Sequence, residues 1–397
     1  MYYLNNIINL SIEKFALKFF EKTKYGSLSV EFPSGKISKF EGKEYGVSAK
    51  IKLKNFLLIK KIVKRGAIGF AESYMDGDFN TDDLKNLLIF AEKNKSSFLI
   101  YSKKKKLINA YSKIKHYFKQ NTISQAKKNI KYHYDLGNKF YELWLDDTMT
   151  YSSGFFSKSD DDLHTSQINK YKKIIENINI NENSSLLEIG CGWGGFSTFV
   201  AQNFNVKIDA ITISKEQYEY TSSKIFNKGL NDKINVKLQD YRYINTKYDN
   251  IVSIEMFEAV GKKYWPLYFK KISENLKDTG KAALQIITIN EDRKDFYQQN
   301  PDFIQQYIFP GGILPSKNQL FEMTNSMGLN FCEINSFGNS YASTLNMWNK
   351  QFQRKWDNIS KQGYTERFKR MWEYYFSYCE AGFLTKVTDV SQFLLKN

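Results

Sequence analysis

Short apolar runs alternate with amphipathic stretches along the chain from about residue 165 to its end. The apolar runs predict buried strands, and apolar side chains spaced three and four residues apart predict helices between them. The predicted strands are 185–189, 207–213, 234–238, 248–254, 280–288, 330–335 and 390–395. This alternation is typical of an α/β fold, in which a mostly parallel sheet carries helices on both faces and binds ligands at the carboxyl ends of its strands.

The N-terminal third shows a different pattern. Residues 4–20 carry apolar side chains close to one helical stripe and lysines on another face. This segment is predicted to form a helix that either packs on its own domain or lies on a bilayer. Alternating runs over 27–58 predict strands, and a glycine-punctuated loop is expected at 66–78. A helix at 81–90, capped by Thr81, completes a small α+β domain.

These patterns predict the domain organisation. Residues 1–115 are expected to form the α+β domain, 116–131 a linker, and 132–397 the α/β domain. Residues 132–160 combine aromatic and polar side chains with a small-residue loop, which favours a lid over a site. A purely structural aromatic cluster is the alternative for this segment.

Composition is consistent with packed cores in both domains. Of 397 residues, 42% are hydrophobic and 16% aromatic, so wholesale disorder is not expected. No apolar run approaches the roughly 18 residues of a transmembrane helix, and the N-terminus lacks the features of a signal peptide. Cys191, Cys332 and Cys379 fit neither a disulfide framework nor a metal-binding spacing. We therefore expect a cytoplasmic protein without a bound metal.

The positive charge is concentrated in the first third of the chain. Residues 1–129 contain 26 Lys and Arg against 11 Asp and Glu, whereas the remaining residues contain 32 against 31. Such a block indicates an anionic partner, either a nucleic acid or a membrane surface. The codon bias of an AT-rich genome is the alternative cause, but it should raise the lysine content throughout the chain.

The segment from Ser185 to Phe196, S-L-L-E-I-G-C-G-W-G-G-F, is the first candidate for a binding site. A predicted strand runs into a turn with glycines at 190, 192, 194 and 195, and a helix follows. Glycine permits a tight turn and the close approach of a ligand to the backbone. The segment therefore resembles the nucleotide-binding corner of a doubly wound sheet, although a plain tight turn would look the same.

The ends of the next two strands indicate which nucleotide would bind. Thr212 and Gln217 stand where a dinucleotide-binding protein has an acidic residue for the ribose, and the glycine turn has no basic residue for a pyrophosphate. Asp240 is placed to accept a hydrogen bond from an adenine amino group. S-adenosylmethionine, an adenosine cofactor without phosphate, fits this pattern better, and its sulfonium favours nearby acidic and aromatic groups.

From about Tyr132 onwards the chain resembles the cyclopropane-fatty-acyl-phospholipid synthases, which use S-adenosylmethionine and are related to the mycolic acid cyclopropane synthases. The resemblance rests on ordered motifs: Y-H-Y-D-L-G-N (132–138), M-T-Y-S (149–152), L-E-I-G-C-G-W-G-G-F (187–196), S-I-E-M-F-E-A-V-G (253–261), F-P-G-G (309–312), L-P-S (314–316), Y-A-S-T-L (341–345), R-M-W-E-Y-Y (370–375) and C-E-A-G-F (379–383). It implies a Rossmann-like class I methyltransferase domain. The basic N-terminal third resembles, more weakly, a membrane-associated domain.

The resemblance also implies a cofactor pocket and a substrate. The implied cofactor-binding residues are Tyr151, Ser152, Glu188, Gly190, Gly192, Gly194, Thr212, Ile213, Gln217, Gln239, Asp240 and Tyr241. In the implied reaction a cis alkene attacks the methyl group of the sulfonium, and loss of a proton then closes a cyclopropane ring. The expected partner is an unsaturated phospholipid, met at the inner face of the membrane.

Members of this family hold a bicarbonate ion as the base, and two of its contact positions are changed here. Ser153 stands in place of a cysteine and Ile287 in place of a histidine. Since isoleucine cannot donate a side-chain hydrogen bond, either bicarbonate is held differently, with Gln285 as a candidate contact, or another base acts. The resemblance also points to Cys379, but a direct chemical role for its thiol is disfavoured because no histidine lies near it in the sequence. The implied catalytic residues are Glu258, Tyr341, Ser153 and Cys379.

Three other functions stay open at this point. The first is methylation of the alkene to a methylene- or methyl-branched chain, the second nucleic-acid methylation, and the third an inactive lipid-binding relative. Nucleic-acid methyltransferases that act on amino groups usually carry an Asn/Asp-Pro-Pro-aromatic motif where this chain has residues 254–257, I-E-M-F, so no nucleic-acid partner is expected. The retained Glu258, Tyr341 and glycine turn argue against an inactive relative. Whether the chain forms a homodimer is left open.

Overall fold

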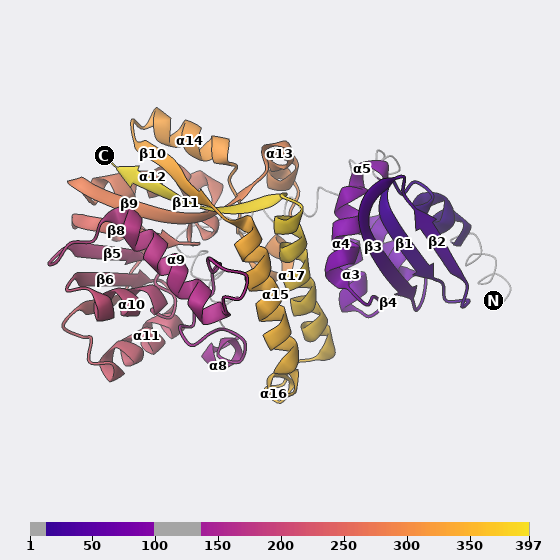
Figure 1. Cartoon of the computed structure of the whole chain (residues 1–397), viewed down its shortest axis with the longest axis horizontal. Coiled ribbons are helices and arrows are strands. Elements are labelled where there is room, and N and C mark those ends of the chain that lie inside the picture. Colours follow the sequence, from indigo (N-terminus) through magenta and orange to yellow (C-terminus); the bar gives the residue numbers. More distant parts are fainter. Residues whose placement is uncertain (1–12, 99–135, 397) are drawn as a thin grey trace. The chain divides into compact units, whose positions relative to one another are not determined.

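Two compact units make up the residues that the computed structural model describes, 13–98 and 136–396 (Figure 1). Unit 1 contains the described N-terminal residues to 98 together with Asn300–Phe303 and Trp356–Thr385, and unit 2 contains the rest. This division differs from the expected single domain over 132–397, because a C-terminal pair of helices belongs to unit 1. The predicted linker and residues 132–135 of the predicted lid lie outside the described residues.

Unit 1 is built on a four-stranded sheet in the order β2-β1-β3-β4, in which β1 runs antiparallel to β2 and parallel to β3. Alternate side chains along β3 are buried, as in a strand with one covered face. The strands are β1 (Tyr25–Glu31), β2 (Ile37–Glu41), β3 (Glu44–Leu53) and β4 (Phe79–Asn80). The helices are α2 (Leu57–Arg65), α3 (Ala67–Met75), α4 (Leu84–Lys93), α5 (Lys95–Phe98), α16 (Trp356–Ser360) and α17 (Glu366–Leu384).

Two local predictions for unit 1 are wrong. Most of the expected loop at 66–78 is helix α3, which packs closely on α2: a Cβ on Gly69 would lie 2.1 Å from the carbonyl oxygen of Lys61. Helix α4 is capped by Asp83 and not by Thr81, because the Asp83 carboxylate accepts a hydrogen bond from the backbone N–H of Asn86 at 2.9 Å. The predicted helix over 4–20 is helical in its described part, 13–20.

Helix α17 is joined to the N-terminal part of unit 1 by side-chain contacts. The Arg370 guanidinium donates to the carbonyl oxygens of Tyr74 and Phe79, the latter at 2.7 Å, and lies 4.1 Å from the centre of the Tyr74 ring. The Tyr74 hydroxyl donates to Glu373 at 3.0 Å. These contacts explain why α17 belongs to unit 1 although it lies far from α3 in the sequence.

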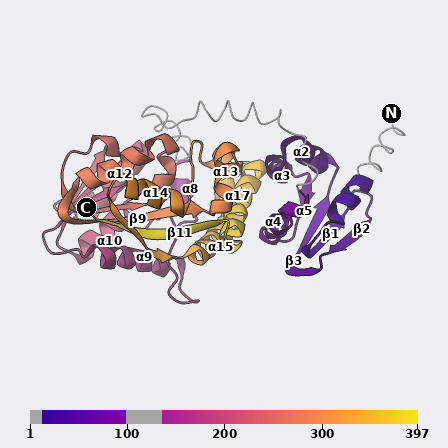
Figure 2. The same cartoon turned by 90° about the horizontal axis from the view of Figure 1, so that it is seen from above.

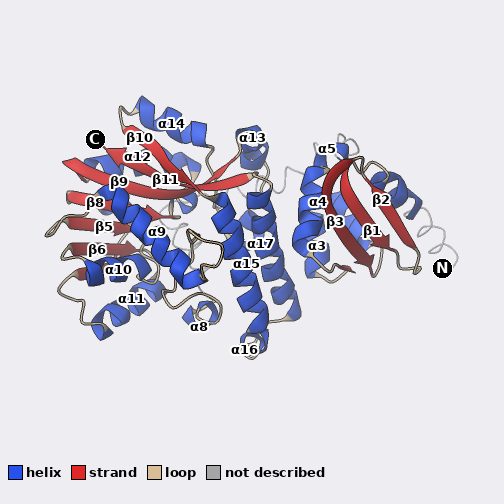
Figure 3. Cartoon of the chain, in the orientation of Figure 1, coloured by secondary structure: helices blue, strands red, loops and turns tan. Residues whose placement is uncertain are grey.

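Unit 2 contains a seven-stranded sheet in the order β10-β11-β9-β8-β5-β6-β7 (Figure 3). Neighbouring strands from β9 to β7 are parallel, whereas β11 is antiparallel to both β9 and β10. The strands are β5 (Ser185–Ile189), β6 (Lys207–Thr212), β7 (Ile234–Leu238), β8 (Tyr248–Ile254), β9 (Leu276–Ile289), β10 (Asn330–Ser336) and β11 (Thr388–Lys396). All seven predicted strands are therefore present, and the mostly parallel α/β prediction is confirmed.

Helices cover both faces of this sheet, with α9 and α10 on one side and α12 and α14 on the other (Figure 2). One core packs Tyr171, Phe196 and Val200 against the first face, and the other packs Trp265 and Phe269 against the second. The helical segments are α8 (Asn138–Tyr141), α9 (Leu163–Ile178), α10 (Gly195–Asn203), α11 (Lys215–Asn227), η2 (Tyr241–Tyr243), η3 (Phe257–Ala259), η4 (Lys262–Tyr264), α12 (Trp265–Glu274), α13 (Glu291–Gln299), η5 (Ile304–Ile308), α14 (Lys317–Ser326) and α15 (Gly338–Arg354).

Candidate active site

The turn after β5 is held in a conformation that glycine adopts easily. Gly190, Gly192 and Gly194 have φ angles of 82°, 54° and 74°. A Cβ on Gly190 would lie 2.8 Å from Cγ of Met256, so packing requires this glycine. A Cβ on Gly192 would meet no atom of the described residues within 4 Å. The turn therefore leaves open space beside its backbone, as a ligand that approaches the glycines requires.

Glu188, a predicted cofactor contact, joins β5 to α10. Its side chain is buried, and its carboxylate accepts a hydrogen bond from the Ser197 hydroxyl in the first turn of α10. Burial raises the pKa of Glu188 to about 7. In the structure this carboxyl group fixes the strand and the helix on either side of the glycine turn.

The polar residues after β6 form a small buried network. The Thr212 hydroxyl donates to the side-chain carbonyl of Gln217 at 2.9 Å and accepts from the Ser214 N–H at 3.1 Å. The Ser214 hydroxyl caps α11 by accepting from the Gln217 N–H at 3.3 Å. These bonds, on either side of Ile213, hold the end of β6 against the start of α11. A bond from the Gly190 N–H to the Ile211 carbonyl ties the same end of β6 to the glycine turn.

Asp240 lies after β7 and is held by Arg242. The Arg242 guanidinium donates to Oδ1 at 2.9 Å and to Oδ2 at 2.6 Å, and its backbone N–H donates to Oδ1 at 3.0 Å. Because each carboxylate oxygen has two lone pairs, Oδ2 keeps one for a further donor such as an adenine amino group. Arg242 thus orients Asp240, a role that the sequence did not suggest.

The two neighbours of Asp240 differ in their surroundings. The Gln239 N–H donates to the Thr212 carbonyl at 2.9 Å, and this bond ties the ends of β6 and β7 together. The Tyr241 ring is buried edge-on against Tyr268, with their centres 5.3 Å apart, and burial raises the pKa of Tyr241. Tyr241 therefore packs in the core formed with α12.

Tyr151 and Ser152 lie on the loop between α8 and α9. The Tyr151 ring sits in an aromatic cluster with Trp144 and Trp348, at centre distances of 5.5 and 5.2 Å. The Ser152 hydroxyl accepts a hydrogen bond from Nζ of Lys170 at 2.6 Å. This loop therefore contains both the packed aromatic rings and the polar contacts that the sequence of the predicted lid indicated.

Lys170, on α9, is a buried lysine that the sequence analysis missed. Its side chain has no exposed surface, and burial lowers its pKa to about 7. The charge of Glu255 has the largest effect in the opposite direction and raises this pKa. The signal in the sequence was Gln167 and Lys170, two polar residues on the face of α9 that otherwise carries Tyr171 and Ile174. Gln167 donates to the Ser152 carbonyl at 2.9 Å, so both residues hold the 151–153 loop.

Glu255, directly after β8, is the centre of a hydrogen-bond network. Its Oε1 accepts from the Ser153 N–H at 2.9 Å and from the Gln285 side-chain amide at 2.8 Å. Its Oε2 accepts from the Tyr341 hydroxyl at 2.6 Å. Three distant segments therefore supply donors to one carboxylate, and two of the predicted catalytic residues, Ser153 and Tyr341, come together there.

Glu258, a predicted catalytic residue, has fewer partners. Its Oε1 accepts from the Ile287 N–H at 2.5 Å, and its buried Oε2 has no hydrogen-bond partner among the described residues. Burial, together with the neighbouring Glu255, raises the pKa of Glu258 to about 8. This shift favours the protonated form of Glu258 at neutral pH.

These residues do not fit an additional bicarbonate ion. The Ser153 N–H and the Tyr341 hydroxyl already donate to Glu255, and the Ser153 hydroxyl donates to the Gly154 carbonyl at 2.8 Å. Gln285, the suggested replacement contact, also donates to Glu255. An anion placed here would meet the Glu255 carboxylate, and among these residues only a protonated Glu258 could offer it a side-chain donor that is not already engaged.

The described residues do fit S-adenosylmethionine. The open space beside Gly192 admits a ligand to the glycine turn, and Asp240 retains an acceptor for adenine. The acidic and aromatic side chains at the strand edge, Glu255 and Tyr151 among them, suit a sulfonium cation. When bound, this cofactor supplies an electrophilic methyl group.

Cys379, the fourth predicted catalytic residue, belongs to unit 1. It lies on α17 next to Tyr378, whose hydroxyl donates to Asp302 at 3.1 Å. Burial, followed by the Asp302 charge, raises the pKa of Cys379 well above its ordinary value. Such a thiol is not ionised at neutral pH and is a poor nucleophile.

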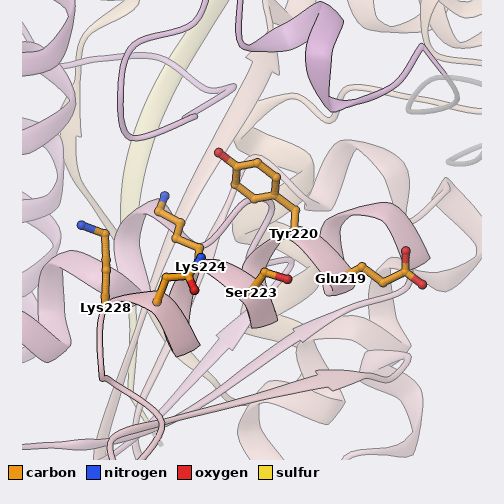
Figure 4. Close-up of a pocket in the computed structure, with 6 residues that line it drawn as sticks. Glu219, Tyr220, Ser223, Lys224 and Lys228 are labelled. Carbon is orange, nitrogen blue, oxygen red and sulfur yellow. The ribbon is translucent and has the colours of Figure 1, made fainter.

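An open pocket is lined by residues of α11 and by Lys228 after it (Figure 4). Tyr220, Lys224 and Lys228 are among its lining residues. The Lys224 ammonium donates to the carbonyls of Thr148 and Trp193 at 3.1 and 3.2 Å, so it holds the loop before Tyr151 against the glycine turn. Burial lowers the pKa of Lys224 to about 8.

Within the described residues, no helix has the length and apolar character to cross a membrane, and no group of three or more His, Cys, Asp or Glu residues could hold a metal ion.

Sequence and structure comparisons agree on the class of protein. A family profile described as "Mycolic acid cyclopropane synthetase" matches residues 121–393, and one described as a domain of unknown function matches residues 15–103. The fold is similar to that of mycolic acid cyclopropane synthase CmaA1 complexed with SAH and CTAB, with a TM-score of 0.64, 28% identity and coverage of 68% of this chain and 98% of that one. The protein is an S-adenosylmethionine-dependent methyltransferase with the class I fold.

Among characterised proteins, the chain is 34% identical over 348 residues to the cyclopropane-fatty-acyl-phospholipid synthase of Escherichia coli, covering 84% of each chain. It is 33% identical over 350 residues to the tuberculostearic acid methyltransferase of Mycobacterium tuberculosis, covering 85% of this chain and 81% of that one. The chain belongs to the mycolic acid cyclopropane synthetase family.

Proposed function

We propose that this enzyme transfers a methylene group from S-adenosylmethionine to the cis double bond of unsaturated phospholipid acyl chains, which gives cyclopropane acyl chains. The observation that carries the proposal is the carboxylate of Glu255, which is held by three donors directly after the carboxyl end of β8. Ring closure requires removal of a proton from the transferred carbon, and a fixed carboxylate supplies the acceptor. The likeness to the Escherichia coli synthase supports the substrate class.

The residues of unit 2 assist this reaction by position. The Tyr151 ring packs on the buried Trp144 and Trp348 rings in an apolar cluster that excludes water, and the partly exposed Tyr151 is the ring that could face a cationic intermediate. Lys170 and Gln167 hold the 151–153 loop that carries Tyr151. An alkene is a weak nucleophile, so its alignment with the methyl group carries much of the catalysis.

A second candidate product is a methylene- or methyl-branched chain. The tuberculostearic acid methyltransferase, 33% identical to this chain, favours this alternative. The two products diverge after methyl transfer, when the cation either closes a ring or shifts a hydride and loses a different proton. The family and the cofactor are the same in both cases.

We also propose that the N-terminal part of the protein meets the cytoplasmic face of the membrane. On α2, Leu57 and Val63 are exposed at 44% and 51%, and Lys60 and Lys64 are exposed beside them. Apolar and basic side chains on one helix face suit an interface with anionic lipid. The excess of positive charge in residues 1–129 supports the same surface.

One assay tests the function. The purified protein is incubated with methyl-labelled S-adenosylmethionine and vesicles of monounsaturated phospholipid, and the acyl chains are analysed by mass spectrometry and proton NMR. We expect a gain of CH2 with loss of the alkene signal. A retained alkene signal with the same mass gain supports the branched product, and label in nucleic acid, or none in lipid, contradicts the proposal.

A further inference from the structure

Glu255 has a backbone conformation that a residue with a side chain seldom adopts. Its φ is 51°, in the left-handed region that favours glycine. The strain is offset locally, because the Glu255 N–H donates to the Gln285 carbonyl at 2.8 Å and the side chain makes three further bonds. Residues held in this way cluster at functional sites. The position needs a functional explanation that the fold alone does not supply.

The donors to Glu255 are themselves fixed. Ser153, Gln285 and Tyr341 are all buried, and the Gln392 side-chain amide donates to the side-chain oxygen Oε1 of Gln285 at 3.2 Å. Gln285 is thereby oriented with its N–H toward Glu255. Donors that are fixed before the reaction stabilise a carboxylate more effectively than mobile groups or water.

The distribution of donors decides which of the two neighbouring carboxyl groups is ionised. Two carboxylates close together do not both ionise readily. Glu255 accepts from three donors, whereas Glu258 accepts only from the Ile287 N–H among the described residues. Lys170, which lies near Glu255, also favours the ionised form of that group. Burial raises the pKa of both groups, but the three donors oppose this effect at Glu255, so the negative charge is favoured on Glu255 and the proton on Glu258.

We propose that Glu255 is the general base of this enzyme, a built-in carboxylate in place of a bound bicarbonate ion. The inference rests on the proposed alkene alkylation. The alkene π pair forms a carbon–carbon bond to the methyl carbon as the carbon–sulfur bond breaks, and the sulfur keeps that bonding pair as a neutral thioether. Glu255 then removes a proton from the transferred carbon, and the freed C–H pair forms the second ring bond. The proton later leaves to water.

The hydrogen bonds identify the oxygen that acts. Oε1 of Glu255 accepts twice, from Ser153 and Gln285, so both of its lone pairs are engaged. Oε2 accepts once, from Tyr341, and keeps one lone pair. The proton is therefore accepted at Oε2, and Tyr341 positions that atom.

The first test compares Glu255→Gln with a surface control, Glu176→Gln. The Gln side chain at 255 keeps the size of Glu but cannot accept the proton, so we expect kcat to fall by about 100- to 10,000-fold. The affinity for S-adenosylmethionine, measured by calorimetry, should fall by about fivefold at most, because the loss of one charge near the sulfonium weakens binding far less than the loss of the base slows the reaction. The matched control is Glu176→Gln on the exposed side of α9, which should keep the wild-type kcat. Wild-type kcat in Glu255→Gln would overturn the proposal.

The second test restores the base from outside. Glu255→Gly suits the φ of 51° at this position and removes the carboxylate without backbone strain. We expect this variant to be inactive in carbonate-free buffer and to regain turnover as bicarbonate or formate is added. The wild type should be indifferent to bicarbonate. A wild-type enzyme that loses its activity in carbonate-free buffer and regains it with bicarbonate contradicts the proposal.

A binding measurement separates this inference from the proposed function. Carbon-13-labelled bicarbonate should give a bound NMR signal with Glu255→Gly and none with the wild type, whatever reaction the enzyme catalyses. If no label reaches phospholipid with any variant, the proposed function fails, and the NMR result still decides whether Glu255 fills the position of an anion. A bound signal in the wild type would overturn the inference.

Discussion

At the scale of single residues, the site depends on three buried or partly buried ionisable groups whose pKa values are shifted by burial. Burial raises the pKa of Glu258 to about 8 and lowers that of Lys170 to about 7, whereas the donors to Glu255 oppose the rise that burial causes in its pKa. Burial alone would neutralise all three. The structure thus separates the roles of two carboxyl groups that lie three positions apart.

Replacement of Glu258 by Gln should remove a pH dependence of stability. The pKa of Glu258 is about 8 in the folded protein, above its ordinary 4.5, so the folded state holds an extra proton between these values. The stability that this proton contributes is complete below about pH 4.5 and is lost as the pH rises through about 8. Between about pH 4.5 and 8, the free energy of unfolding of the wild type should fall by about 1.4 kcal/mol per pH unit relative to that of Glu258→Gln. Urea unfolding at several pH values measures the difference; parallel curves would contradict it.

Replacement of Lys170 by Met should weaken cofactor binding more than turnover. The variant loses the bond from Nζ to the Ser152 hydroxyl, at 2.6 Å, and frees the 151–153 loop. We expect KM for S-adenosylmethionine to rise about tenfold, the cost of one good hydrogen bond. Any change of KM near pH 7 in the wild type should also disappear, because the pKa of Lys170 is about 7.

The matched control is Lys173→Met on the same helix. Lys173 pairs with Glu176 at the surface at 2.9 Å, and its loss should leave both kinetic constants unchanged. If Lys170→Met lowers the melting temperature without a change in KM, Lys170 has only a structural role.

At the scale of elements, α17 shows that sequence order does not decide to which unit a helix belongs. Its motif resembles the catalytic family, yet its described contacts are with α3, α4 and β4 of unit 1. The apolar face of α17 includes Trp372 and Phe376, which are buried. Burial of this face favours packing on whichever neighbour offers an apolar surface and matching polar groups.

Replacement of Arg370 by Ala should destabilise unit 1 by about 1–3 kcal/mol, because two carbonyl oxygens, of Tyr74 and Phe79, lose their charged donor. The control is Arg367→Ala on the same helix. Arg367 is 52% exposed and pairs with Asp76 at 2.8 Å, so its loss should cost less than about 1 kcal/mol. Urea unfolding of both variants makes the comparison, and equal effects would contradict the assigned role of Arg370.

At the scale of the whole molecule, the charge of +16 is the property that most concerns partners. It is concentrated before residue 130, whereas the α/β part is nearly neutral. In the sequence, a basic region precedes a nearly neutral one, and this distribution is consistent with the proposed contact with anionic lipid.

Charge reversal on α2, Lys60→Glu with Lys64→Glu, should reduce binding to vesicles that contain anionic phospholipid. Each basic side chain near such a surface contributes about 1 kcal/mol, so binding should fall by roughly tenfold or more. The same reversals at exposed positions of unit 2, Lys172 and Lys350, serve as the control. Co-sedimentation with the vesicles at low and high salt measures the effect. An equal loss of binding in the two double variants would show that net charge, and not α2, determines binding.

The sequence alone was sufficient to predict the strands of the α/β unit and the class of cofactor that it binds. Strands such as β5 and β8 are encoded by local apolar runs, and the glycine turn requires glycine whatever surrounds it. The polar ends of β6 and β7 could also be located, because parallel strands place their carboxyl ends at one edge of the sheet.

Only the tertiary structure revealed Glu255 as the centre of the site and α17 as part of unit 1. The donors to Glu255 come from Ser153, Gln285 and Tyr341, which are brought together by the register of β8 on β9 and by the packing of the 151–153 loop and α15. Local periodicity carries no information on such contacts, since it describes which side of an element is buried and not what covers it. The protonation of Glu255 and Glu258 follows from those contacts, so the chemistry of the site was decided by the fold.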